Sequence, residues 1–125
     1  MPSAEQVVRD FCAAASTRDP TVLRSFFTDD VVYHNIPMDP CVGIDATIGF
    51  IEGFFSMCDA MTIEMTHLAV NDSVVLTERV DVFTVGGKTV PLPVMGAFEM
   101  RDGKICAWRD YFDMAQITKA WCGDS

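Results

Sequence analysis

The chain has 125 residues, a length typical of one domain, and 50% of them are hydrophobic, so a sizeable core can be buried. No apolar run approaches the roughly 20 residues of a membrane span. The formal net charge of -9 argues against nucleic acids and anionic membranes as partners. The first residues lack the basic and then apolar pattern of a signal peptide, so we expect one cytoplasmic domain over residues 1–125.

The sequence contains five cysteines, at positions 12, 41, 58, 106 and 122, and two histidines. Neither their odd number nor their spacing matches a disulfide framework or a metal site. We interpret the cysteines as small core residues in a reducing compartment, and the histidines as structural or surface residues.

The first part of the chain predicts helices. A capping box at Ser3 and Gln6 is followed by apolar residues at helical spacing. The pair Asp19-Pro20 is typical of a helix start, so we expect a short helix that buries Phe26 and Phe27. The next predicted elements are a strand over Val31–Asn35, a loop over residues 36–40 and a helix from about Asp45 to Met57.

The second part of the chain predicts strands, with turn signals at Gly86-Gly87 and Asp102-Gly103. Pro91 and Pro93 place the start of the third strand at an edge or a bulge. The predicted elements are strands over Met61–Val70, Val74–Val85, Lys88–Arg101 and Lys104–Asp113, and a helix over about Ala115–Trp121. Helices followed by an antiparallel meander indicate an α+β fold. A curved sheet wrapped around the N-terminal helices would form a cone with a deep apolar pocket.

Asp110 lies in a predicted strand beside large aromatic residues. Alternate side chains of a strand share a face, so Trp108, Asp110 and Phe112 would point the same way. Cys106 would join them on that face. A carboxylate on an apolar face is costly to desolvate, which makes Asp110 the first candidate for chemistry. A flipped strand would instead leave Asp110 on the surface, but it would also expose Trp108 and Phe112.

Two other predicted strands place polar side chains beside apolar ones. Arg79 and Asp81 share a strand face, about 6–7 Å apart. Tyr33 and Asn35 share a face of the short strand. Each pair alone has a simpler interpretation, because Arg79 and Asp81 could be a surface ion pair and Tyr33 and Asn35 could tie down a loop. A functional site requires both pairs to converge on Asp110.

If the three segments converge, two aspartates with an arginine between them can hold different protonation states. One carboxylate, kept ionised by Arg79, can act as a base. The other, kept protonated by apolar surroundings, can act as an acid, and Tyr33 and Asn35 can bind a water molecule. This set suits the addition of water across a bond, and it requires no metal, cofactor or nucleophilic serine.

Four motifs occur in a specific order, namely Tyr33-His34-Asn35-Ile36-Pro37, Thr77-Glu78-Arg79-Val80-Asp81-Val82, Gly103-Lys104-Ile105 and Trp108-Arg109-Asp110-Tyr111-Phe112-Asp113. With these motifs in register from about Val7 to Trp121, the chain resembles limonene-1,2-epoxide hydrolases. The resemblance implies a homodimer. It also implies a curved, mostly antiparallel mixed sheet wrapped around helices, of the nuclear-transport-factor-2-like or SnoaL-like type.

The resemblance further implies a role for each polar residue. Asp110 would be the general base that deprotonates water, and Tyr33 and Asn35 would hold that water. Asp81 would be the general acid that protonates the epoxide oxygen, and Arg79 would bridge the two aspartates. The implied reaction is a one-step hydrolysis of a small apolar cyclic epoxide to a vicinal diol, with no covalent intermediate.

By the same resemblance, the pocket is lined by Met38, Phe54, Cys58, Phe83, Leu92, Val94 and Phe112. Phe54 and Phe83 are bulkier than the aliphatic residues expected there, and the hairpin over Val85–Val90 is shorter than in the family. The resemblance therefore predicts epoxide hydrolysis without identifying the preferred epoxide, its enantiomer or the carbon attacked.

Two other functions fit parts of the pattern. A ketosteroid-isomerase-like or polyketide-cyclase-like enzyme would also use aspartates and a tyrosine in an apolar pocket, but it would not require an arginine between two aspartates. A non-enzymatic binding module would need the pocket without the polar set. The presence of the whole polar set favours the hydrolase.

Overall fold

The computed structural model describes residues 2–122, with side chains through Lys119, so the side chain of Cys122 lies outside the described part. The helices are α1 (Ala4–Ala15), α2 (Pro20–Arg24), α3 (Ile44–Met57) and α4 (Met114–Cys122). The strands are β1 (Phe27–Asn35), β2 (Cys41–Val42), β3 (Ala60–Asn71), β4 (Val74–Val85), β5 (Lys88–Arg101) and β6 (Lys104–Tyr111).

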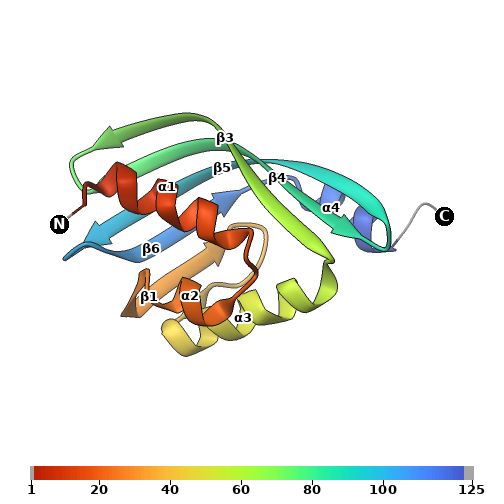
Figure 1. Ribbon diagram of the computed structural model, residues 1–125, viewed down its shortest axis with the longest axis horizontal. Helices are drawn as coiled ribbons and strands as arrows, with labels where there is room; N and C mark the ends of the chain where they lie inside the picture. Colours follow the sequence, from red (N-terminus) through yellow and green to blue (C-terminus); the bar gives the residue numbers. More distant parts are fainter. Residues whose placement is uncertain (1, 123–125) are drawn as a thin grey trace.

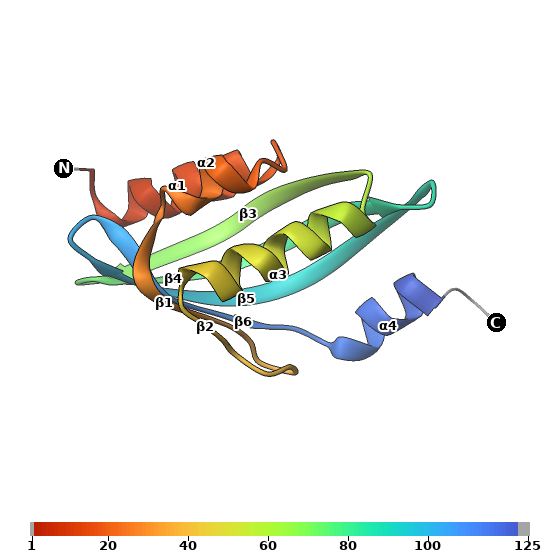
Figure 2. The ribbon, with the colours of Figure 1, turned by 90° about the horizontal axis from the view of Figure 1, so that it is seen from below.

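The strands form a six-stranded curved sheet in the order β2-β1-β6-β5-β4-β3 (Figure 1). β1 and β6 pair in parallel, and the other neighbouring strands are antiparallel. Helices α1, α2 and α3 lie on one side of the sheet, whereas α4 lies apart from them beyond the end of β6 (Figure 2). The predicted α+β class, with a mixed and mostly antiparallel sheet, is confirmed.

The first two helices begin where the sequence predicts. The hydroxyl of Ser3 accepts a hydrogen bond of 3.1 Å from the backbone N–H of Gln6 and thereby caps α1. The carboxylate of Asp19 accepts one of 3.0 Å from the N–H of Thr21 at the start of α2. No helix among the described residues is long and apolar enough to cross a membrane.

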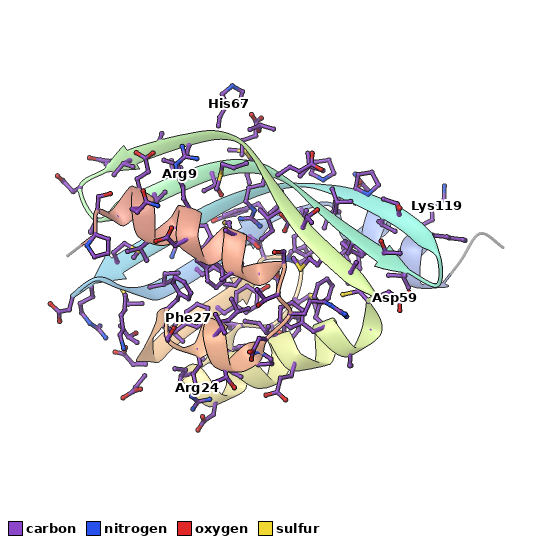
Figure 3. All side chains as sticks on the ribbon, viewed as in Figure 1. Arg9, Arg24, Phe27, Asp59, His67 and Lys119 are labelled. Carbon is purple, nitrogen blue, oxygen red and sulfur yellow. The ribbon has the colours of Figure 1, made fainter. Side chains whose placement is uncertain are left out.

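The expected position of Phe26 and Phe27 in the second helix is wrong. α2 ends at Arg24, and β1 begins at Phe27 rather than at Val31. Phe27 pairs with Ile105 of β6, and its ring lies 5.3 Å from that of Phe11 in α1. Figure 3 shows Phe27 among the interior side chains. Pairing and packing with distant segments therefore extend the strand, which local periodicity does not reveal. The short strand β2, which pairs with β1, was also not predicted.

The first half of β5 lies at an edge, as its prolines predict. Pro91 and Pro93 pair with β4 alone, and β6 joins the other side of β5 only from Met95 onward. A proline lacks the N–H that a second neighbouring strand would need. This arrangement leaves room beside the first half of β5.

The expectation that Cys106 shares a face with Trp108 is wrong. The pairing register shifts between Glu99 and Met100 of β5, so Cys106 is an extra residue in β6. Ile105 takes the fully buried position, and the thiol of Cys106 donates to the carbonyl oxygen of Glu99 at 3.4 Å.

A row of aromatic rings crosses the covered face of the sheet. Tyr33 of β1, Trp108 of β6 and Phe98 of β5 are register partners. The ring of Trp108 stacks on Tyr33 at 4.1 Å and on Phe98 at 5.4 Å, and Phe11 of α1 meets its edge at 5.0 Å. Such pairs contribute roughly 0.5–1.5 kcal/mol each beyond their buried area. The row aligns three strands, so the residues two positions further along form the next row.

Candidate active site

Beside the aromatic row of Tyr33, Trp108 and Phe98, a second row of mostly polar residues crosses four strands of the sheet. Asn35 of β1 pairs with Asp110 of β6, Asp110 pairs with Gly96 of β5, and Gly96 pairs with Thr77 of β4. Directly paired residues share a face of the sheet. Asn35 and Asp110, which are far apart in the sequence, are therefore neighbours on the face that the helices cover.

Arg79 and Asp81 follow Thr77 on the same face of β4, and both are buried. Arg79 is 1% exposed, Asp81 8% and Asp110 4%. The interpretation of Arg79 and Asp81 as a surface ion pair is wrong, and so is the flipped strand that would expose Asp110. The three segments converge.

The guanidinium of Arg79 holds both carboxylates at once. Nε and Nη2 donate to the two oxygens of Asp81 at 3.0 and 2.9 Å. Nη1 and Nη2 donate to the two oxygens of Asp110 at 3.0 and 2.9 Å. Nη1 also donates to the hydroxyl of Thr77 at 3.3 Å. Every N–H of the guanidinium thus has an acceptor, which fixes its position in the protein interior.

Burial and charge act in opposite directions on the members of this cluster. Burial raises the pKa of Asp81 above its ordinary value, with Asp110 adding to the rise and the contacts with Arg79 opposing it. Burial alone would lower the pKa of Arg79, but the neighbouring aspartates outweigh it and raise that pKa, so the guanidinium stays charged. The cluster therefore joins a permanent cation to a carboxyl group whose pKa lies above its ordinary value.

Tyr33 and Asn35 lie beside Asp110. The hydroxyl of Tyr33 donates to Oδ1 of Asn35 at 3.1 Å, and both side chains are buried. Burial raises the pKa of Tyr33 well above its ordinary value, so the phenol remains a neutral donor. The carboxylate of Asp110 therefore lies beside a hydroxyl and an amide, and all three groups can contact the same small polar molecule.

An apolar cavity of about 560 Å³ opens above the cluster, lined by Asp81, Asp110, Tyr33 and Asn35 among many apolar side chains. Arg79 is not a lining residue and lies beneath the two carboxylates. Of the pocket residues predicted from the sequence, those that line the cavity are Met38, Phe54, Phe83, Leu92, Val94 and Phe112.

Cys58 does not line the cavity, contrary to expectation. It is the residue at which α3 ends and the backbone becomes extended. Its thiol points back to the carbonyl oxygen of Phe54 at 3.5 Å, and the residue packs behind Phe83 and Leu92. The end of the helix therefore directs this side chain into the core.

The described residues near the cluster do not favour a nucleophilic cysteine or a metal site. Burial raises the pKa of Cys12 to about 12, so this neighbouring thiol stays protonated and is a poor nucleophile. Among the described side chains, no three histidine, cysteine, aspartate or glutamate residues gather as metal ligands. The groups that face the cavity can supply a proton, accept a proton and orient a small molecule.

Three contributions to the cluster were not predicted. The hydroxyl of Thr77, two residues before Arg79 on the same strand, accepts from Nη1 of that arginine. The indole N–H of Trp108 donates to Asp110 at 2.7 Å, and Gly96 lies in the polar row itself. The two-residue spacing of Trp108 and Asp110 is a signal for their contact, whereas the place of Gly96 depends on strand register.

The family model described as the limonene-1,2-epoxide hydrolase catalytic domain matches residues 2–123. The chain belongs to the limonene-1,2-epoxide hydrolase family. It is similar to the epoxide hydrolase EphG of Mycobacterium tuberculosis, with 30% identity over 112 residues that cover 90% of this chain and 74% of the relative.

Two solved structures are similar to this chain in fold. An LEH-like epoxide hydrolase from Mycobacterium tuberculosis superposes with a TM-score of 0.82 at 29% identity, over 93% of this chain and 86% of that chain. An NTF2-like protein of unknown function from Burkholderia pseudomallei gives a TM-score of 0.84 at 19% identity, over 95% of this chain and 97% of that chain. The second likeness concerns the fold alone.

Proposed function

We propose that this member of the family hydrolyses apolar epoxides to vicinal diols in one step, by general acid and base catalysis. The observation that carries the proposal is the double contact of Arg79 with Asp81 and Asp110 beneath an apolar cavity. A cation between two buried carboxyl groups allows one to be ionised while the other keeps a proton. The similarity to an epoxide hydrolase of Mycobacterium tuberculosis supports the same reaction.

In the proposed reaction, Tyr33 and Asn35 hold a water molecule against Asp110. Asp110 removes one proton from the water as its oxygen attacks an epoxide carbon. The carbon–oxygen bond of the ring breaks, and its electron pair goes to the epoxide oxygen. Asp81 donates its proton to that oxygen, which completes the diol without a covalent link to the protein.

The protonation state that this reaction requires of Asp81 agrees with the surroundings of that residue. Burial raises the pKa of Asp81, as a general acid requires. After one turnover Asp110 carries a proton and Asp81 has lost one, so a proton must return from one to the other. Arg79 contacts both carboxylates and stabilises the cluster in either state.

The volume and the apolar walls of the cavity indicate which kinds of substrate it can hold. A volume of about 560 Å³ falls within the roughly 300–1,000 Å³ typical of sites for drug-sized ligands. Its apolar walls favour epoxides without charged groups. We propose small alicyclic epoxides, limonene-1,2-epoxide among them, as the first class to test, together with bulkier apolar epoxides.

We further propose that the chain is a homodimer that associates through the outer face of its sheet. Met95 and Tyr111 are register partners on this face, and each is about half exposed, as is Leu76 nearby. A second copy would cover these side chains. Sedimentation analysis of the protein and of a Met95→Glu variant tests this, since the variant should shift the protein to monomer.

We also propose a cytoplasmic location, because the described cysteines have free thiols, as is usual for proteins in a reducing compartment.

The experiment that tests the function measures diol formation from limonene oxide, cyclohexene oxide, styrene oxide and bulkier apolar epoxides. Asp110→Asn and Asp81→Asn should each abolish turnover while the fold survives. Asp59→Asn, at an exposed carboxylate outside the site, is the matched control. Turnover by Asp81→Asn near that of the control would contradict the acid role.

A second experiment tests the one-step mechanism. Under single-turnover conditions in ¹⁸O-water, the diol should acquire its new oxygen directly from solvent. Label delivered through an aspartate would indicate a covalent intermediate. If the protein instead exchanges an α-proton of a cyclic ketone and leaves all epoxides intact, an isomerase-like function replaces the proposal.

A further inference from the structure

Gly96 lies beneath the guanidinium of Arg79. Arg79 belongs to β4 and Asp110 to β6, so the ion pair between them must pass over β5, which separates the two strands. The residue of β5 that is paired with Asp110 on one side is Gly96. Further along β5, the ring of Phe98 lies 5.9 Å from Cζ of Arg79. The guanidinium therefore spans β5 at the point where β5 has no side chain.

The space above Gly96 is already filled by the cluster. A Cβ atom at this position would lie 2.3 Å from Nη1 of Arg79 and 2.6 Å from Oδ1 of Asp110. It would also lie 3.0 Å from the hydroxyl of Thr77. The first two distances are far below van der Waals contact, so even one methyl group would force the guanidinium and the carboxylate apart.

The backbone of Gly96 does not itself require glycine. Its φ angle lies outside the left-handed region, where the glycines at the turns are found. A glycine inside a strand is less favourable than alanine, because it loses more conformational freedom and packs no side chain. The reason for glycine at this position must therefore lie in what occupies the space above it.

We propose that Gly96 is a positioning residue whose missing side chain forms the seat of the Arg79 guanidinium. Thr77 completes the seat, because its hydroxyl accepts from Nη1 of Arg79 and donates to the carbonyl oxygen of Gly96 at 3.2 Å. The inference rests on the proposed function and deepens it, since the seat determines whether one cation can hold both aspartates. Any side chain at position 96 would uncouple Asp110 from Arg79.

A double-mutant cycle of Gly96→Ala with Arg79→Lys tests this proposal. Lysine keeps the positive charge but lacks Nη1, the atom nearest to the added Cβ. Gly96→Ala alone should lower the unfolding midpoint and reduce kcat by roughly a hundredfold, with KM within about threefold, as for the loss of a preorganised charged contact. In the Arg79→Lys background the same change should cause clearly smaller losses in both quantities, because the 2.3 Å contact with Nη1 is gone and only the contacts with Asp110 and Thr77 remain.

Gly49→Ala is the matched control for stability. Gly49 lies in regular structure in α3, and a Cβ there meets no atom within 4 Å. Its effect on the unfolding midpoint should be the same with arginine or lysine at position 79. If Gly96→Ala fails to fold with arginine present but folds with lysine, that result also supports the seat.

Other outcomes overturn the proposal. Equal losses from Gly96→Ala in both backgrounds would mean that the guanidinium of Arg79 is not what requires glycine at this position. The same conclusion follows if neither variant folds, and an absence of any effect would mean that no seat exists. If the unaltered protein hydrolyses no epoxide, the proposed function fails, but the unfolding cycle still decides whether Gly96 positions Arg79.

Discussion

The indole N–H of Trp108 donates a hydrogen bond of 2.7 Å to Oδ1 of Asp110, two residues further along the same face of β6. The same oxygen accepts from Nη1 of Arg79 at 3.0 Å. The indole is itself held between the rings of Tyr33 and Phe98. Asp110 is thus oriented from two directions, by a cation on β4 and by a ring that is packed into the aromatic row.

Trp108→Phe should reduce kcat/KM by about tenfold to a hundredfold, because a hydrogen bond to a charged group contributes roughly 1.5–3 kcal/mol. Phenylalanine keeps an aromatic ring between Tyr33 and Phe98, so the protein should remain folded. Steady-state kinetics with the best epoxide of the panel measures the loss, and thermal unfolding checks the fold. A folded variant with unchanged kcat/KM would show that the indole N–H does not contribute to the orientation of Asp110.

The activity should fall as the pH rises through the pKa of Asp81, because the general acid must carry a proton. Burial raises this pKa, so the decline begins at a higher pH than for an ordinary aspartate. Above that pKa, kcat/KM should drop tenfold for each pH unit. A pH–rate profile of the protein beside Asp59→Asn provides the measurement, and a rate that stays level into alkaline solution would argue against an acid role for Asp81.

The stability of the protein should also depend on the state of Asp81. Its folded-state pKa is raised above the ordinary 3.8, so the folded protein favours the protonated form. This contribution to the free energy of unfolding is fully present below the unfolded pKa and is lost as the pH rises through the folded pKa. Asp81→Asn carries no proton to lose. Urea unfolding of both proteins across pH should show the unaltered protein losing stability relative to Asp81→Asn as the pH rises, whereas a constant difference contradicts the raised pKa.

Periodicity in the sequence correctly placed Asp110 with Trp108 on a buried strand face, and it correctly placed Arg79 with Asp81 on one face while leaving open whether that face is buried. Alternation indicates which face a residue occupies, because successive side chains of a strand point to opposite sides. It does not indicate which residues of distant strands are paired. The row that joins Asn35 to Asp110 depends on a parallel pairing of β1 with β6, and that register arises from packing across the whole sheet.

The same limit explains what the sequence did not reveal about Gly96 and Cys58. The reason for a glycine in a predicted strand cannot be inferred until its partners on both neighbouring strands are known. For Gly96 these partners are Thr77 and Asp110, which only the strand register reveals. The end of α3 at Met57 was predicted, so the place of Cys58 depends instead on the extended backbone that begins at this residue and on its packing against Phe83 and Leu92. Such packing and strand register are set by nonlocal contacts, so local patterns leave them open.

Tyr33→Phe should lower kcat by up to about tenfold, since a neutral hydrogen bond contributes roughly 0.5–1.5 kcal/mol. The variant loses the hydrogen bond to Asn35 and the hydroxyl oxygen that can accept from the bound water, while the ring still stacks on Trp108. The pKa of Tyr33 is raised by burial, so the phenol is neutral throughout the working range and the shape of the pH–rate profile should not change. Tyr111→Phe, at the tyrosine on the outer face of the sheet away from the cavity, is the control, and a changed profile in Tyr33→Phe alone would indicate that the phenol titrates.

Gly53→Val should narrow the cavity and change which epoxides the protein accepts. Gly53 lines the cavity from α3, and a Cβ there meets nothing within 4 Å, so the valine side chain would extend into space that substrate can occupy. A difference of one methylene in an apolar pocket changes binding by roughly 1–3 kcal/mol. The ratio of kcat/KM for a bulky epoxide to that for cyclohexene oxide should therefore fall by about tenfold or more. Glu52→Val adds the same side chain to the exposed face of the same helix, and an equal change of the ratio in both variants would place Gly53 outside the path of the substrate.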